Sequence, residues 1–202
     1  MVKSRKMIRK IISDFYMVLI LIFLYAPILT MMILSFNQSK SRARWGGFTL
    51  DWYLQMFDSR SIMSALSTTL IIAFVSALAA AVIGTAAAIA IQSMRLVPRT
   101  IIMGITNIPM LNADIVTGIS LMLSFIAFGV SLGFKTVLIA HITFNIPYVI
   151  LSVMPKLKQT DKSTYEAALD LGATPLQAFF KVVFPDILPG VLSGFLLSFT
   201  MS

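Results

Sequence analysis

The sequence predicts an all-α protein, a polytopic bundle of transmembrane helices, and three observations support that prediction. The chain of 202 residues is 58% hydrophobic, and its mean hydropathy is +0.91. Several apolar runs approach or exceed the roughly 20 residues that a helix needs to cross a bilayer. Basic residues gather beside the ends of these runs, which accounts for the formal charge of +8 better than nucleic-acid binding does.

Four apolar runs are long enough to span a membrane, and a fifth begins near the end of the sequence. The spans are expected at 15–36, 62–91, 100–127 and 136–154, and the fifth run starts at Gly190. The first run follows a basic start, but it is longer than the apolar region of a typical signal peptide and no small-residue cleavage site follows it, so we expect an uncleaved span. The fifth run is too short to cross. Either it is re-entrant or, as we expect, the sequence is C-terminally truncated.

The distribution of Lys and Arg predicts the orientation. If the N-terminus is cytoplasmic, eleven basic residues lie inside and five lie outside. The positive-inside rule therefore places the N-terminus and the polar segment 155–188 in the cytoplasm. Four basic residues in the outer loop 37–60 oppose this assignment without reversing it.

We divide the chain into two parts. Residues 1–60 hold the N-terminal tail, the first span and an outer loop, and residues 61–202 hold a transmembrane domain with a cytosolic loop at 155–188.

In the second span, Ala80, Gly84 and Ala88 repeat at four-residue spacing. Small residues on one face let another helix approach closely, which is needed either for packing within the chain or for a subunit interface.

The polar segment 155–188 predicts a short helix–turn–helix at the membrane surface. Asp161 or Ser163 can cap the first helix, and Gly172 stands where a helix ends in the left-handed conformation. Pro185 should end or bend the second helix at about Phe184.

The start of that second helix carries its own signals. Thr174 and Gln177 form a capping box around Pro175, which suits a first helical turn. We expect its apolar side chains to rest on the bundle, namely Leu176, Phe179, Phe180 and Val183.

The same segment resembles the cytosolic loop of binding-protein-dependent ABC importer permeases. The residues that carry the resemblance are Glu166, Ala167, Ala168, Gly172, Val182, Phe184 and Pro185. The family favours Ile and Leu where this chain has Val182 and Phe184, and both differences are conservative. Further stretches look like the spermidine/putrescine branch, namely 45–53, 114–116, 118–121, 141–147 and 198–202.

The resemblance implies a type I ABC importer permease in a bacterial inner membrane, forming the pathway for spermidine or putrescine. It implies a second permease subunit, an extracytoplasmic solute-binding protein and a pair of ATPase subunits as partners. ATP and Mg would be bound by the ATPase, so no cofactor is expected in this chain. The residues implied to couple to the ATPase are Glu166, Ala167, Ala168, Gly172, Val182 and Pro185.

Candidate residues for the solute pathway come from polar groups inside the spans. Asp114 is the carboxylate that we place within a span, and Asn107 and Asn112 lie close before it. A carboxylate at depth would suit a polyamine ammonium group, or it could cap a helix that restarts after Pro109. Pro109 with Asn112 indicates a broken helix.

His141 and Asn145 lie four residues apart, on one face of the fourth span. The histidine could make an interhelical hydrogen bond or could form part of a substrate or proton site. It is the single histidine of a chain without cysteine, so no metal site is expected.

Other functions remain as alternatives. A permease of the same class could carry ferric ion, a phosphonate or another organic ion, and the chain could also be a non-functional truncated permease or a membrane scaffold. The sequence shows no nucleophile–base pair, metal cluster or cofactor loop, so we expect a transport subunit rather than an enzyme.

Overall fold

The computed structural model describes residues 2–41, 43–111 and 114–202, and it divides into two compact units, Met1–Leu66 and Ser67–Ser202. Within the described residues all regular secondary structure is helical, and one isolated antiparallel bridge joins Asn37 to Phe48. The predicted all-α class is therefore confirmed.

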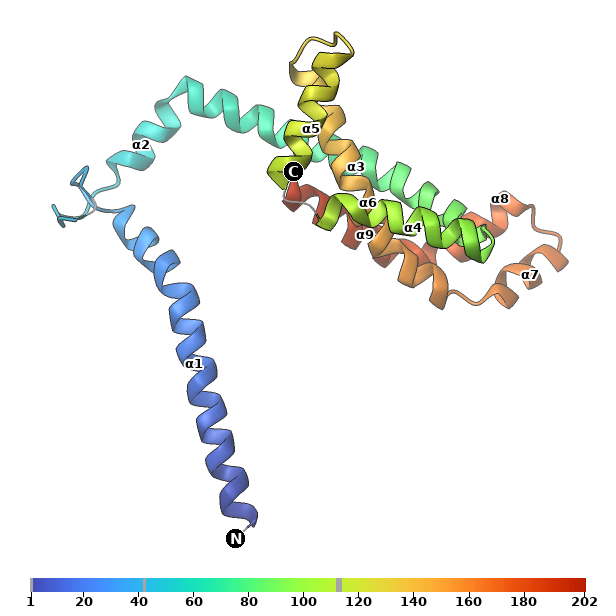
Figure 1. Cartoon of the computed structure of the whole chain (residues 1–202), viewed down its shortest axis with the longest axis horizontal. Helices are drawn as coiled ribbons and strands as arrows, with labels where there is room; N and C mark the ends of the chain where they lie inside the picture. Colours follow the sequence, from blue (N-terminus) through green and yellow to red (C-terminus); the bar gives the residue numbers. More distant parts are fainter. Residues whose placement is uncertain (1, 42, 112–113) are drawn as a thin grey trace. The chain divides into compact units, whose positions relative to one another are not determined.

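The first unit contains α1 (Val2–Leu34), α2 (Asp51–Asp58) and the beginning of α3 (Arg60–Ser93). The second unit contains the rest of α3 and the helices that follow it (Figure 1). These are α4 (Leu96–Leu111), α5 (Asp114–Ala127), α6 (Phe134–Gln159), α7 (Lys162–Asp170), α8 (Pro175–Ala178), the π-helical η1 (Phe179–Val183) and α9 (Phe184–Met201).

Among the described residues, four helical stretches are long and apolar enough to cross a membrane. They are Ser13–Leu34, Arg60–Ser93, Phe134–Gln159 and Pro175–Met201. The first three agree with the expected first, second and fourth spans. The expected third span is divided into α4 and α5, which are bent by 105° and would together make a fifth span. Pro109 lies two residues before the end of α4, where it lacks a backbone donor and crowds the preceding turn.

The end of the chain differs from the prediction at Pro185. We expected this proline to end or bend a helix, with apolar sequence resuming at Gly190, but one helical stretch runs from Pro175 to Met201. The π-helical η1 explains the difference, because the N–H of Phe184 donates to the carbonyl of Phe179, five residues back. Pro185 then falls in the first turn of α9, where a missing N–H does little harm.

The core of the second unit forms where α3, α6 and α9 meet at small residues. A Cβ added to Gly84 of α3 would lie 2.7 Å from Cβ of Val149 on α6. On α9, a Cβ added to Gly194 would lie 3.1 Å from Cα of Val149, and one added to Gly190 would lie 2.9 Å from the Ser152 carbonyl oxygen. Both neighbours therefore approach α6 at positions that have no side chain.

A hydrogen-bonded layer joins the same three helices two turns away. The Ser202 Oγ lies 2.9 Å from Ser76 Oγ and 2.7 Å from His141 Nδ1. Ser76 and His141 stand eight positions before Gly84 and Val149, whereas Ser202 stands eight positions after Gly194. The direction of counting shows that α3 and α6 run parallel and that α9 runs antiparallel to both.

The small-residue stripe of α3 lies inside this core. Ala80 and Ala88 are fully buried and belong to the same apolar cluster as Val149 and Val153. Of the two uses considered for the stripe, the structure therefore shows packing within the chain.

Gly84→Ala should destabilise the second unit by about 1–3 kcal/mol, because the new methyl group overpacks a rigid contact. Unfolding in detergent, followed by circular dichroism, measures the change. Gly118→Ala is the control, since no atom lies within 4 Å of a Cβ added there. Equal stability of the two variants would contradict the packing described for Gly84.

Candidate functional site

Segment 155–188 begins in the last turns of α6 and continues into α7. The Asp161 Oδ1 accepts a 2.9 Å hydrogen bond from the backbone N–H of Ser163, so Asp161 rather than Ser163 is the N-cap of α7. Hydrogen bonds from the Ser163 backbone and side chain hold the pKa of the Asp161 carboxyl below its ordinary value. The start of α7 is therefore fixed by a charged cap.

The turn after α7 depends on Gly172. Its φ is +87°, and the N–H groups of Ala173 and Gly172 donate to the carbonyls of Ala168 (3.1 Å) and Leu169 (2.9 Å). This pair of bonds is a Schellman motif, which satisfies carbonyls at the helix end. A Cβ added to Gly172 would have no atom within 4 Å, so glycine is required by the backbone conformation and not by a lack of space.

The helix after the turn begins with the expected capping box. The Thr174 Oγ1 accepts from the Gln177 N–H at 3.3 Å, and the Thr174 N–H donates to Gln177 Oε1 at 3.1 Å. Pro175 occupies the first turn. Two well-defined helix ends therefore enclose a short rigid turn.

The buried face of this helix agrees with the prediction at Phe179 and Val183 and differs from it at Leu176 and Phe180. Ala178 and Ile187 are buried and Val183 is half-buried, whereas Leu176 and Phe180 are 71% and 56% exposed. The step from Ala178 to Val183 is five residues because it crosses the π-helical turn. The extra residue in that turn rotates the buried stripe away from the positions that an α-helix would place there.

The residues of the proposed coupling motif are mostly accessible. Glu166, Ala167 and Pro185 are exposed, and Ala168 and Val182 are half-buried. Beside them, three large apolar side chains are exposed to 89%, 71% and 56%, and we call them the exposed apolar face: Leu171, Leu176 and Phe180. Large exposed apolar groups of this kind are suited to contact another protein or the membrane.

A cavity of about 400 Å³ separates α7 from the bundle. Glu166 and Tyr165 line it from α7, Phe179 from η1, and Gln92 and Ser93 from the end of α3. The Oε1 of Gln92 is buried without a hydrogen-bond partner among the described residues. The element that carries Glu166 is therefore supported at its ends and by η1, not by close packing along its whole length.

The side chains of three of the five candidate pathway residues are described, and they do not line one common cavity. His141 and Asn145 lie on α6, and His141 makes the interhelical hydrogen bond to Ser202. Asn145 is fully buried, and neither its Oδ1 nor its Nδ2 has a partner among the described residues. The side chain of Asp114 and the whole of Asn112 lie outside the described residues.

Asn107 has different surroundings. It lines a cavity of about 700 Å³ whose other lining residues include Arg99 and Lys158. Two cations in this cavity make it a poor place for a positively charged solute. Asn107 is therefore not grouped with His141, which lines a separate cavity of about 180 Å³ with Thr117 and Phe144.

An interhelical hydrogen bond was one of the two roles expected for His141, but the layer that it forms with Ser202 and Ser76 was not predicted. A signal for it was present, because Ser76 stands four residues before Ala80 and extends the small-residue stripe. On α9, Gly190, Gly194, Ser198 and Ser202 also follow one another at four-residue spacing. Reading both four-residue patterns together would have paired the two serines.

Comparison with known families and relatives agrees with these features. The model of the family described as "Binding-protein-dependent transport system inner membrane component" matches residues 80–202. The putrescine transport system permease protein PotI of Escherichia coli K12 is 39% identical over 187 residues, which cover 89% of this chain and 66% of the relative.

Two further relatives are covered over more of their length. The spermidine/putrescine transport system permease protein PotC of Haemophilus influenzae is 36% identical over 97% of this chain and 76% of its own length. The PotC homolog of Mycoplasma genitalium is 30% identical over 98% of this chain and 74% of its own length.

Asp161→Ala should speed amide hydrogen exchange in the first turn of α7, while Asp161→Asn should retain most of the protection because it keeps the accepting oxygen. The lowered pKa means that the carboxylate contributes fully above its unfolded pKa of about 3.9 and loses its contribution as the pH falls through the folded value. Exchange ratios between wild type and each variant, taken at the same pH, test this. A ratio that does not change between pH 7 and pH 3 would contradict the role of the charged cap.

Proposed function

This chain belongs to the family of binding-protein-dependent transport system inner membrane components, and from that premise we propose that it is the permease subunit of an ATP-driven importer of putrescine or spermidine. The names of the relatives support the choice of solute, since they include a putrescine and a spermidine/putrescine permease. In this proposal the N-terminus and segment 155–188 are cytoplasmic.

The observation that carries the coupling role is the exposed apolar face beside Glu166. Leu171 ends α7, while Leu176 and Phe180 lie in α8 and η1, on the two sides of a turn whose backbone is fixed by Gly172 and by two capped helix ends. We assign this face and Glu166 to contact with an ATPase subunit, which binds ATP and Mg. Ala167 is exposed next to Glu166 and leaves room for close approach.

The helix from Pro175 to Met201 supplies a route from the docked turn to the core. It starts directly after the turn and continues without a gap to the glycines that contact α6. A displacement of the turn would therefore act on the contact at Val149 and on the serine–histidine layer. Such a rigid connection can bias two arrangements of a bundle when a partner moves.

The remaining partners are a second permease subunit and an extracytoplasmic solute-binding protein. Support for both comes from the family, which is described as the inner membrane component of a binding-protein-dependent transport system. Asp114 remains our candidate for a counter-charge to a polyamine ammonium group.

Gly172→Val should lower uptake of labelled putrescine and spermidine by about tenfold or more. A β-branched residue resists the left-handed conformation by more than the 1–2 kcal/mol that is typical of L-residues, so the docked turn is lost. Uptake is measured in cells that lack their own polyamine importers and express the chain with its partner subunits.

Gly172→Asn is the matched control, because asparagine tolerates positive φ and the site has free space. It should keep most of the uptake. Equal uptake by wild type and Gly172→Val would contradict the coupling role, while an assembled complex that imports neither polyamine would contradict the solute.

Glu166→Lys should weaken association with the ATPase without affecting membrane insertion. The side chain is exposed, lines the open cavity beside α7 and makes no hydrogen bond or ion pair among the described residues, so its replacement should act mainly on the partner. Co-purification of the ATPase with a tagged permease measures the effect. Recovery of normal amounts of ATPase would count against the contact role of Glu166.

A further inference from the structure

The loop after α1 has a fixed structure of its own. Asn37 is 2% exposed, and its Nδ2 donates to the carbonyls of Arg44 (2.7 Å) and Ser41 (3.2 Å). Its Oδ1 accepts from the N–H groups of Gly46 (2.7 Å) and Ser39 (3.2 Å). One buried amide therefore joins four backbone groups of the loop, which is the way a polar side chain organises a turn in place of regular secondary structure.

Aromatic residues attach this loop to α2. The Trp52 Nε1 donates to the Asn37 carbonyl at 2.9 Å, and the Tyr53 hydroxyl shares a 2.7 Å hydrogen bond with Ser35. Phe36 stacks on Phe48 with ring centroids 5.2 Å apart. The aromatic side chains thus hold the end of α1, the loop and α2 together within the first unit.

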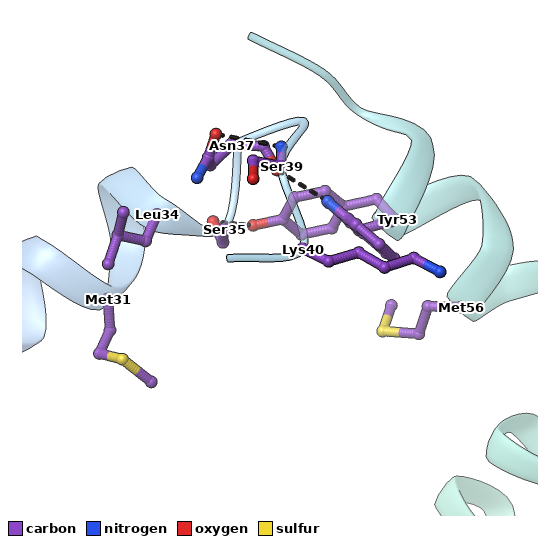
Figure 2. Close-up of a pocket in the computed structure, with 9 residues that line it drawn as sticks. Met31, Leu34, Ser35, Asn37, Ser39, Lys40, Tyr53 and Met56 are labelled. Atoms are coloured by element: carbon purple, nitrogen blue, oxygen red, sulfur yellow. Dashed lines mark hydrogen bonds between the residues drawn. The ribbon is translucent and has the colours of Figure 1, made fainter. Parts of the chain in front are cut away.

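This arrangement encloses a cavity of about 630 Å³ with two chemically different sides. Polar groups come from the loop, including Lys40 and Ser39, while Met31, Leu34 and Met56 are apolar. Figure 2 shows Lys40 extended across the pocket toward Met56, with Met31 and Leu34 coming from α1 on the opposite side. No carboxylate among the described residues lines the cavity, so the ammonium group of Lys40 is available to an anion.

A second cavity, of about 490 Å³, continues from the first along α1. The two share Met31, Ser35 and Tyr53, and the second adds Pro27 and Ile28. Those two residues belong to the apolar helix Ser13–Leu34, whereas Lys40 stands six residues beyond its end. The combined space therefore leads from a cationic end at the membrane surface to an apolar groove at the depth of the acyl chains.

We propose that these two cavities form a binding site for an anionic phospholipid. The phosphate of the lipid contacts Lys40, and one acyl chain lies along Pro27, Ile28 and Met31. Trp52 and Tyr53 occupy the interfacial position that such aromatic residues favour. In the orientation proposed above, the lipid belongs to the outer leaflet.

The charge of the loop agrees with this occupant. Residues 37–60 carry four basic and two acidic side chains, a net charge of +2 on the side where the positive-inside rule expects few cations. A polyamine would be repelled by this loop, whereas a lipid phosphate would be attracted. The four basic residues of this loop, which oppose the predicted orientation, would thus attract the anionic lipid.

Lipid retention by the purified transporter complex tests the site. Native mass spectrometry after titration with phosphatidylglycerol should show that Lys40→Gln lowers its retention about fivefold, the effect expected for one cation near a phosphate. Phosphatidylcholine, which has no net charge, should be retained less by the wild type. This readout does not involve uptake, so it is independent of whether the solute is a polyamine.

Arg44→Gln is the matched control. It removes one positive charge from the same loop, but Arg44 does not line the cavity, and the carbonyl that accepts from Asn37 is unchanged. Arg44→Gln should retain phosphatidylglycerol as the wild type does. Equal losses in both variants would overturn the site in favour of a diffuse charge effect, and no loss in Lys40→Gln would overturn it directly.

A photoreactive residue at Met56 identifies the occupant by a second route. In the intact complex in phosphatidylglycerol-containing membranes, we expect a covalent adduct with the mass of that lipid. The same probe at Phe57, which is 65% exposed and outside the cavity, is the control for accidental labelling. An adduct with a neighbouring protein at Met56, or equal lipid labelling at both positions, would overturn the proposal.

Discussion

The arrangement of the second unit depends on how closely α3 and α9 approach α6. Lipid tails are as apolar as leucine side chains, so helices in a bilayer gain little from the hydrophobic effect and associate through van der Waals contact and hydrogen bonds instead. Gly84 and Gly194 make that contact close by presenting bare backbone to Val149. The hydrogen bonds of Ser202 to Ser76 and His141 then fix the register of the three helices.

This tight core contrasts with the loose attachment of α7. The turn at Gly172 is rigid because of its own hydrogen bonds, yet a cavity lies between α7 and the ends of α3 and α6. A rigid element with limited packing behind it can keep its own shape while it moves relative to the bundle. These properties suit a docking element better than a larger buried interface would.

Much of this structure could be predicted from local chemistry. The helical class, most span positions, the cap at Asp161 and the left-handed turn at Gly172 follow from patterns that lie within a few residues of each other. The continuous helix through Pro185 could not, because a π-helical turn leaves no clear mark in the sequence. The interhelical hydrogen bond of His141 was among the expectations, but the members of its layer could not be predicted, because Ser202 and Ser76 lie 61 and 65 positions away along the chain.

The helix from Pro175 to Met201 also has a mechanical consequence. It contains 27 residues, which correspond to about 40 Å and exceed the roughly 30 Å of a hydrocarbon layer. From the contact at Gly194 to Pro175 the helix forms a lever arm of about 28 Å, so a tilt of about 5° about that contact displaces the Pro175 end by about 2.5 Å. Because Gly190 and Ile187 on this arm also pack closely on the bundle, such a tilt would require α6 to follow, and small rotations of the packed pair would correspond to displacements of atomic size at the docking turn.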